Sequence, residues 1–153
     1  MGSARGQANQ ALYLGKVLLA AWRRDLAAES VAAVTLTQAY LPAVREHLCR
    51  AYGWFLLEIT RPGALPENPP ASLAELPDIA DGKAVPGEIL EFQRLEAEGW
   101  IGEMLTGDST ATPATSAGNL AMSAPPVGPE QAERWAVELQ SLFDRMGDSL
   151  DEY

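Results

Sequence analysis

Apolar residues recur at spacings of three and four along four stretches of the chain, which is the period of an amphipathic α-helix. The pattern predicts helices over residues 7–28, 31–60, 86–105 and 129–150. The last stretch is the most regular of the four, and Pro129 suits its first turn. Its apolar stripe consists of Ala132, Trp135, Ala136, Leu139, Leu142, Phe143, Met146 and Leu150.

Residues that disfavour helices interrupt three of these stretches. Gly15 lies in the apolar stripe of the first and lowers helix stability by about 1 kcal/mol relative to Ala, so we expect another helix to approach closely there. Pro42 predicts either a kink near residue 38 or the start of a new helix. Gly99 predicts a bend or a break in the third stretch. Residues 51–59 are apolar nearly all round, which is typical of a central helix.

The connections differ in composition from the helices. Residues 62–87 are rich in proline, and Ser72 is placed to cap one turn over residues 73–76. Residues 106–128 are rich in Gly, Ser, Thr, Ala and Pro, which is typical of a linker, and only residues 119–122 there are expected to reach a core.

No stretch shows the period of two that a half-buried strand requires. The sequence therefore predicts one all-α domain over residues 1–153: an irregular bundle of about four main helices with a Pro-rich connection and a long Gly/Ser/Thr/Pro-rich loop before the C-terminal helix. That last helix either folds back onto the others or docks on a partner protein.

Charge is distributed unevenly along the chain, whose formal net charge is −10. Residues 1–61 carry 7 Lys and Arg against 4 Asp and Glu, residues 62–108 carry 2 against 10, and residues 109–153 carry 2 against 7. An acidic protein repels phosphate groups, so nucleic acid and anionic membranes are disfavoured as partners. The acidic stretches are either solvated surfaces or a patch that attracts a basic protein.

The N-terminal part of the sequence gives no sign of a targeting segment. No run approaches the roughly 18 apolar residues that cross a bilayer, and no signal-peptide pattern is evident near the N-terminus. We therefore expect a cytoplasmic protein.

Residues with catalytic potential are few. His47 and Cys49 are the only histidine and cysteine, and two helical positions place their side chains about 200° apart, so they cannot chelate one ion. Neither a phosphate-binding Gly-rich loop nor a nucleophile elbow occurs. We therefore predict no catalytic residue, cofactor or metal, although dispersed carboxylates leave an enzyme possible. The carboxylates concerned are Glu88, Glu91, Glu96 and Glu98. The sequence lacks the Glu-x-x-His pairs that bind the metals in di-iron bundles.

Short segments along nearly the whole chain resemble an uncharacterised family of small helical bacterial proteins, classed as a domain of unknown function. The resemblance implies that the last helix belongs to the same domain as the others, and it brings no activity or site residue. The segments are Asn9-Gln10-Ala11-Leu12-Tyr13, residues 50–59, residues 95–100, Asn119-Leu120-Ala121, and Trp135 with Leu139 and Leu142.

Three hypotheses about function follow. The first is a non-enzymatic protein that acts by protein–protein contact through surplus apolar helix surface, including Trp135 and Leu139 of the last helix. The second is a small-molecule-binding protein or enzyme with a pocket between the second and third helices, lined by Tyr52, Trp54 and Trp100. The third, compatible with the first, is self-association through the second or the last helix.

Overall fold

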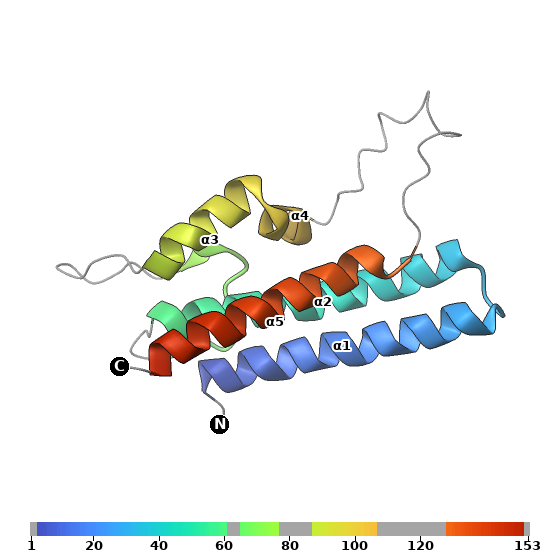
Figure 1. Ribbon diagram of the computed structural model, residues 1–153, viewed down its shortest axis with the longest axis horizontal. Coiled ribbons are helices and arrows are strands. Elements are labelled where there is room, and N and C mark those ends of the chain that lie inside the picture. Colours follow the sequence, from blue (N-terminus) through green and yellow to red (C-terminus); the bar gives the residue numbers. More distant parts are fainter. Residues whose placement is uncertain (1–2, 61–64, 77–86, 107–127, 152–153) are drawn as a thin grey trace.

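The computed structural model describes residues 3–60, 65–76, 87–106 and 128–151. These residues form five α-helices and one short 3-10 helix, with no strand among them, so the predicted all-α class is confirmed (Figure 1). The elements are α1 (Ala4–Ala28), α2 (Ala33–Thr60), η1 (Leu73–Glu75), α3 (Gly87–Glu98), α4 (Trp100–Thr106) and α5 (Glu130–Asp151).

Helices α1 and α2 form a long antiparallel hairpin, and α5 runs along it (Figure 1). The side chain of Ser3 caps the start of α1, and Glu29 ends the helix in a left-handed conformation with φ 55°. Gly15 is the point of close approach between the two helices, because a Cβ there would lie 3.0 Å from Cδ2 of Leu48. The expected reason for this glycine is therefore confirmed.

Helix α2 is a single helix that continues through Pro42, so the predicted alternative of a new helix starting there is wrong. Its two halves differ in burial. The first half buries Leu36 and Val44 on one side, whereas residues 51–57 are buried without interruption. This confirms the prediction that the C-terminal half of the helix is central, because α1, α3, α4 and α5 pack around α2.

The predicted helix over residues 86–105 is two helices, because the chain breaks at Gly99 between α3 and α4. Both helices lie on one side of the three long helices (Figure 1). Gly102 allows their tight junction, since a Cβ there would lie 2.3 Å from the carbonyl oxygen of Glu96. The predicted short turn is also present, and the hydroxyl oxygen of Ser72 accepts from the Ala74 amide at its start.

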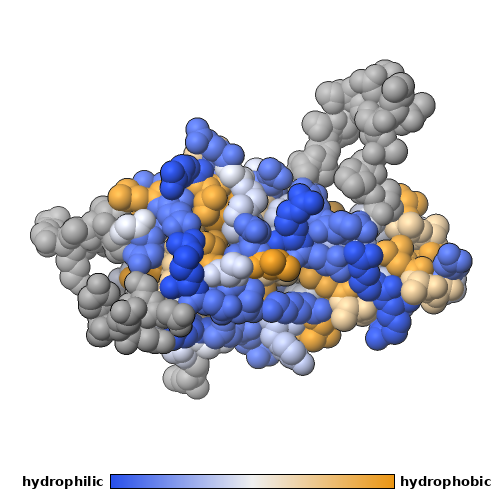
Figure 2. Space-filling view, in the orientation of Figure 1, coloured by the Kyte–Doolittle hydropathy of each residue, from blue (hydrophilic) through white to orange (hydrophobic). Residues whose placement is uncertain are grey.

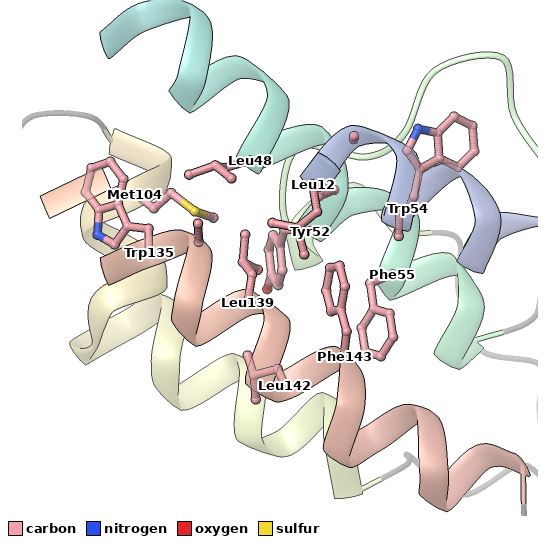
Figure 3. Packing of buried hydrophobic residues seen from close by; sticks show 14 of the residues in the cluster. Leu12, Leu48, Tyr52, Trp54, Phe55, Met104, Trp135, Leu139, Leu142 and Phe143 are labelled. Carbon is pink, nitrogen blue, oxygen red and sulfur yellow. The ribbon is translucent and has the colours of Figure 1, made fainter. Parts of the chain in front are cut away.

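Helix α5 packs within the chain rather than projecting from it. Its apolar stripe contacts α2 and α1, and the ring of Phe143 stacks on Phe55 with centroids 4.3 Å apart (Figure 3). Buried residues of all five helices form one cluster. Residues 119–122 and the side chain of Leu150, which were also expected to touch a core, lie outside the described residues.

Candidate functional site

The five residues predicted to form an interaction or pocket surface are mostly core residues. Tyr52, Trp54, Trp135 and Leu139 are each at most 5% exposed, and Trp100 is half-buried. The prediction of an interaction surface at the four buried residues is therefore wrong. The sequence pattern correctly identified their apolar faces, but the other helices of the same chain cover those faces.

Two of the three predicted pocket residues, Tyr52 and Trp54, do not face the same way. Tyr52 and Trp54 are two positions apart on a helix, so their side chains leave α2 in different directions (Figure 3). The ring of Tyr52 faces α3, where it meets Phe92 edge-on with ring centroids 5.3 Å apart. Its hydroxyl donates a 2.5 Å hydrogen bond to Oε2 of Glu96, which also accepts from the Leu73 amide at 2.9 Å.

This contact joins α2, α3 and η1 through one carboxylate. Burial, followed by the hydrogen bond to Glu96, raises the pKa of Tyr52 far above its usual value, so the hydroxyl stays protonated and remains a donor. Two of the four dispersed carboxylates thus have structural partners. One is Glu96, and the second is Glu91, which accepts two hydrogen bonds from Arg145 of α5. Among the described residues, no group of three or more His, Cys, Asp and Glu side chains is placed to hold a metal ion.

The sole cysteine and its neighbours anchor α4 to α2. Arg45 donates from Nε to the Met104 carbonyl at 2.7 Å and from Nη2 to the Leu105 carbonyl at 2.5 Å, which satisfies the end of α4. The Cys49 thiol points at the same Met104 carbonyl, with Sγ to O at 3.7 Å. Burial raises the pKa of Cys49 to about 11, so this thiol is a poor nucleophile at neutral pH. His47 is half-buried on α2 beside Gly15.

Large apolar side chains remain exposed in several places, at Tyr13, Val17, Leu65, Leu90 and Val137 as well as at Val31 and Val34, and the last two lie close together in the sequence. We call residues 26–43, where α1 turns into α2, the hairpin end. It contains one charged residue, Glu29. Val31 is 45% exposed and Val34 is 52% exposed. Orange and pale orange residues gather at this end of the molecule (Figure 2, right). The exposed residues around the two valines are the apolar Ala27, Ala28, Ala32, Ala33, Ala39, Pro42 and Ala43 and the polar Glu29, Ser30, Thr35 and Gln38.

The hairpin end is exposed because α5 begins too far along the hairpin to cover it. Arg23 of α1 donates from Nε and Nη2 to the two carboxylate oxygens of Glu133, at 2.8 and 2.6 Å, and Nη1 lies 3.5 Å from Glu130. These pairs place the first turn of α5 beside residue 23. The last turns of the hairpin therefore extend past the start of α5 (Figure 1).

Two polar atoms in this half of the hairpin are buried without a hydrogen-bond partner in the described part of the chain: Nε1 of Trp22 and Oγ1 of Thr37. The Trp22 ring stacks on Tyr40, whose hydroxyl donates to Asp25 at 2.5 Å. Buried polar atoms are nearly always paired in folded proteins. The buried polar atoms here are therefore less completely hydrogen-bonded than those around Tyr52.

Sequence reasoning missed the hairpin end as a surface, although one signal was available. Residues 26–43 hold a single charge in a chain with 32 charged residues, 11 basic and 21 acidic. Residues at a predicted helix boundary are usually exposed to water and polar. A lack of charge there therefore indicates a surface that is less polar than usual. Within the described ranges, no helix is both long enough and apolar enough to cross a membrane.

The comparisons with known proteins place no constraint on the site. No protein-family model matches the chain, and the searches of curated proteins and of solved structures give no significant match. The resemblance to a family of small bacterial proteins therefore stays a prediction.

Proposed function

We propose that this protein is a non-enzymatic, cytoplasmic protein that acts by contact with another protein chain, and that the hairpin end is its contact surface. The observation that carries the proposal is the exposure of Val31 and Val34 among seven exposed Ala and Pro residues, with Glu29, Ser30, Thr35 and Gln38 as the exposed polar residues. Isolated exposed apolar residues are common, whereas contiguous apolar patches tend to mark interaction sites.

The chemistry of the other candidate residues supports contact over catalysis. The Cys49 thiol has a raised pKa. Glu96 accepts hydrogen bonds from Tyr52 and Leu73, and Glu91 accepts hydrogen bonds from Arg145. Each of these groups therefore has a role in holding helices together. The region between α2 and α3, where a small-molecule pocket was predicted, contains the contact of Tyr52 with Phe92.

Capture from an extract of the source cell tests this proposal. The wild-type chain is immobilised beside two variants, Val34→Glu and Val137→Glu. The two positions form a matched pair, because each is an exposed helical valine, 52% and 62% exposed, and each variant adds one negative charge. We expect Val34→Glu to lose the captured protein and Val137→Glu to retain it. Calorimetric titration with the purified captured protein then measures the affinity, expected to fall at least about tenfold in Val34→Glu.

Identical captured proteins for the wild-type chain and Val34→Glu would contradict the hairpin end as the contact surface. Equal loss in both variants would instead assign the effect to net charge. Far-UV circular dichroism of both variants checks the fold, and we expect Val34→Glu to fold because a carboxylate near the start of α2 complements the helix dipole.

A further inference from the structure

Helix α1 carries another exposed surface, on the side that faces away from its packing partners α2 and α5. Four exposed residues follow one another there at spacings of three and four, and so form one line along the helix: Tyr13, Val17, Ala20 and Arg24. Tyr13 is 61% exposed and Val17 is 47% exposed. We call these four residues, with Lys16 beside them, the outer face of α1.

The outer face is cationic, although the chain as a whole is acidic. No Asp or Glu is among the exposed residues of α1, and its one carboxylate, Asp25, accepts a hydrogen bond from Tyr40. Lys16 donates to the neutral amide oxygen of Gln140 at 2.6 Å, which leaves its positive charge in place. Arg24 forms no ion pair with a carboxylate in the described part of the chain. The face therefore presents two positive charges around exposed apolar side chains.

Charge is segregated between opposite sides of the molecule. Helix α1 has 4 basic residues and 1 acidic residue, whereas α3 and α4 together have 1 basic residue and 5 acidic residues. Helices α2 and α5 lie between these two groups (Figure 1). On the side of α5 toward α1, Glu130 and Glu133 pair with Arg23, and Asp144 accepts from Gln140.

This segregation decides how the net charge of −10 acts on a ligand at the outer face. Salt screens charges over about 8 Å at physiological ionic strength, so a bound ligand interacts mainly with the charges next to it. Those charges are Lys16 and Arg24, and they favour a ligand that carries carboxylates. The net charge of the whole chain slows the approach of such a ligand, so we expect a modest affinity.

We infer that the outer face of α1 binds an acidic amphipathic helix of another protein. The apolar side of that helix covers Tyr13 and Val17, and carboxylates at its flanks pair with Lys16 and Arg24. Residues 13–24 span about 17 Å of helix, which suits about three turns of a partner helix. Nucleic acid requires a denser array of cations than these two. The outer face is separate from the hairpin end, so this partner goes beyond the proposed function.

Fluorescence anisotropy of labelled synthetic peptides tests this partner with the full chain. The probe is an amphipathic peptide of about 18 residues, with Leu at spacings of three and four and Glu at the flanking positions. A second peptide has Gln in place of each Glu. We expect the glutamate peptide to bind with a Kd of about 10 µM to 1 mM, because the surface is small. The glutamine peptide should bind at least about fivefold more weakly, and added salt should weaken only the glutamate peptide.

Two matched pairs of variants locate the contact. Arg24→Glu and Arg94→Glu each replace an exposed arginine and change the net charge by the same amount, but only the first alters the outer face. We expect Arg24→Glu to weaken binding of the glutamate peptide at least about tenfold and Arg94→Glu to leave it within about twofold. The second pair is Val17→Glu and Val34→Glu, at valines that are 47% and 52% exposed, and only Val17→Glu is expected to weaken the binding.

Three results would overturn this partner: no binding of the glutamate peptide, equal binding of the glutamine peptide, or equal weakening by Arg24→Glu and Arg94→Glu. Tighter binding to vesicles that contain phosphatidylserine than to the glutamate peptide would overturn it in favour of an anionic membrane. Self-association of the wild type that Arg24→Glu abolishes would overturn it in favour of a second copy.

Circular dichroism checks the fold of each variant, and Arg24→Glu keeps the test decisive should Val17→Glu fail to fold. The outcomes for the two surfaces are also distinguishable. A wild-type chain that ignores the glutamate peptide but captures a protein through the hairpin end would overturn the acidic helix and leave the proposed function in place. Peptide binding that Val34→Glu retains would support the acidic helix whatever the hairpin end captures.

Discussion

The Tyr52 hydroxyl shows what one residue contributes to this fold. It is buried at 0% residue exposure and donates to Glu96 at 2.5 Å, in a contact that α2, α3 and η1 share. Hydrogen bonds to charged groups contribute more than neutral ones, and a buried partner left unpaired costs further free energy. The residue thus supplies both apolar packing against Phe92 and a specific connection between elements.

We expect Tyr52→Phe to lower the free energy of unfolding by about 1–3 kcal/mol, because Glu96 loses a donor in a partly buried place. The midpoint of urea unfolding measures the change. Tyr40→Phe is a matched control, since the Tyr40 hydroxyl also donates to a carboxylate, that of Asp25, at a more exposed position. A loss in Tyr52→Phe no larger than that in Tyr40→Phe would show that burial adds nothing to this hydrogen bond.

Cys49 gives a prediction about pH. Burial raises its pKa from 9.0 to about 11 in the folded chain. Between these two values the unfolded chain binds fewer protons at the thiol than the folded chain does. The contribution of the neutral thiol to stability is therefore fully present below pH 9.0 and is lost as the pH rises toward about 11. Urea unfolding of the wild type and of Cys49→Ala across this range measures it.

The difference in unfolding free energy between the wild type and Cys49→Ala should shift against the wild type over that window. A difference that stays constant with pH would mean that the thiol is not shielded from water in the folded chain.

At the scale of elements, glycines set how closely the segments pack. A Cβ at Gly53 would lie 2.2 Å from the Pro70 carbonyl oxygen, so the chain before η1 rests directly on the backbone of α2. Gly53 lies in the fully buried stretch of the central helix, and nothing in the local sequence indicates which segment packs against it. Gly15 is comparable, but its close neighbour is the end of the Leu48 side chain.

We expect Gly53→Ala to destabilise the protein by about 1–3 kcal/mol, although alanine is the better helix former, because a backbone carbonyl must move. Gly15→Ala should cost less, since the methyl group of Leu48 can move and alanine regains up to about 1 kcal/mol of helix propensity. Thermal unfolding of the two variants compares them. A greater loss in Gly15→Ala would place the tighter constraint in the α1–α2 contact instead.

At the scale of the whole molecule, α5 closes the core that the hairpin leaves open on one side. Leu139 is fully buried, whereas Val137, two positions earlier on the same helix, is 62% exposed. We expect Leu139→Ala to cost about 2–5 kcal/mol of unfolding free energy and Val137→Ala to change it by no more than about 0.5 kcal/mol. Urea unfolding measures both, and similar small effects would mean that α5 is not part of the core in solution.

Because Trp135 and Leu139 are buried, substitutions at these positions are poor tests of binding. A marginally stable domain has about 5–15 kcal/mol of stability, so alanine at both positions would remove much of it. Lost binding in such variants would report unfolding. The exposed valines at positions 34 and 137 separate binding from folding more cleanly.

The sequence by itself determined the class of fold and much of its local structure. The three-four periodicity located the long helices, Ser72 and Gly99 marked a turn and a break, and the apolar stretch 51–59 identified the central helix. These features depend on residues close together in the chain, where helix period, capping and backbone preference act.

Only the tertiary structure decided which apolar surface stays exposed. The faces of Trp135 and Leu139 met other helices, whereas the hairpin end stayed exposed because α5 begins beside Arg23. It likewise gave Glu96 and Glu91 their partners, which lie 44 and 54 residues away in Tyr52 and Arg145. Periodicity states that a face must be covered, but the partner that covers it depends on how distant segments pack.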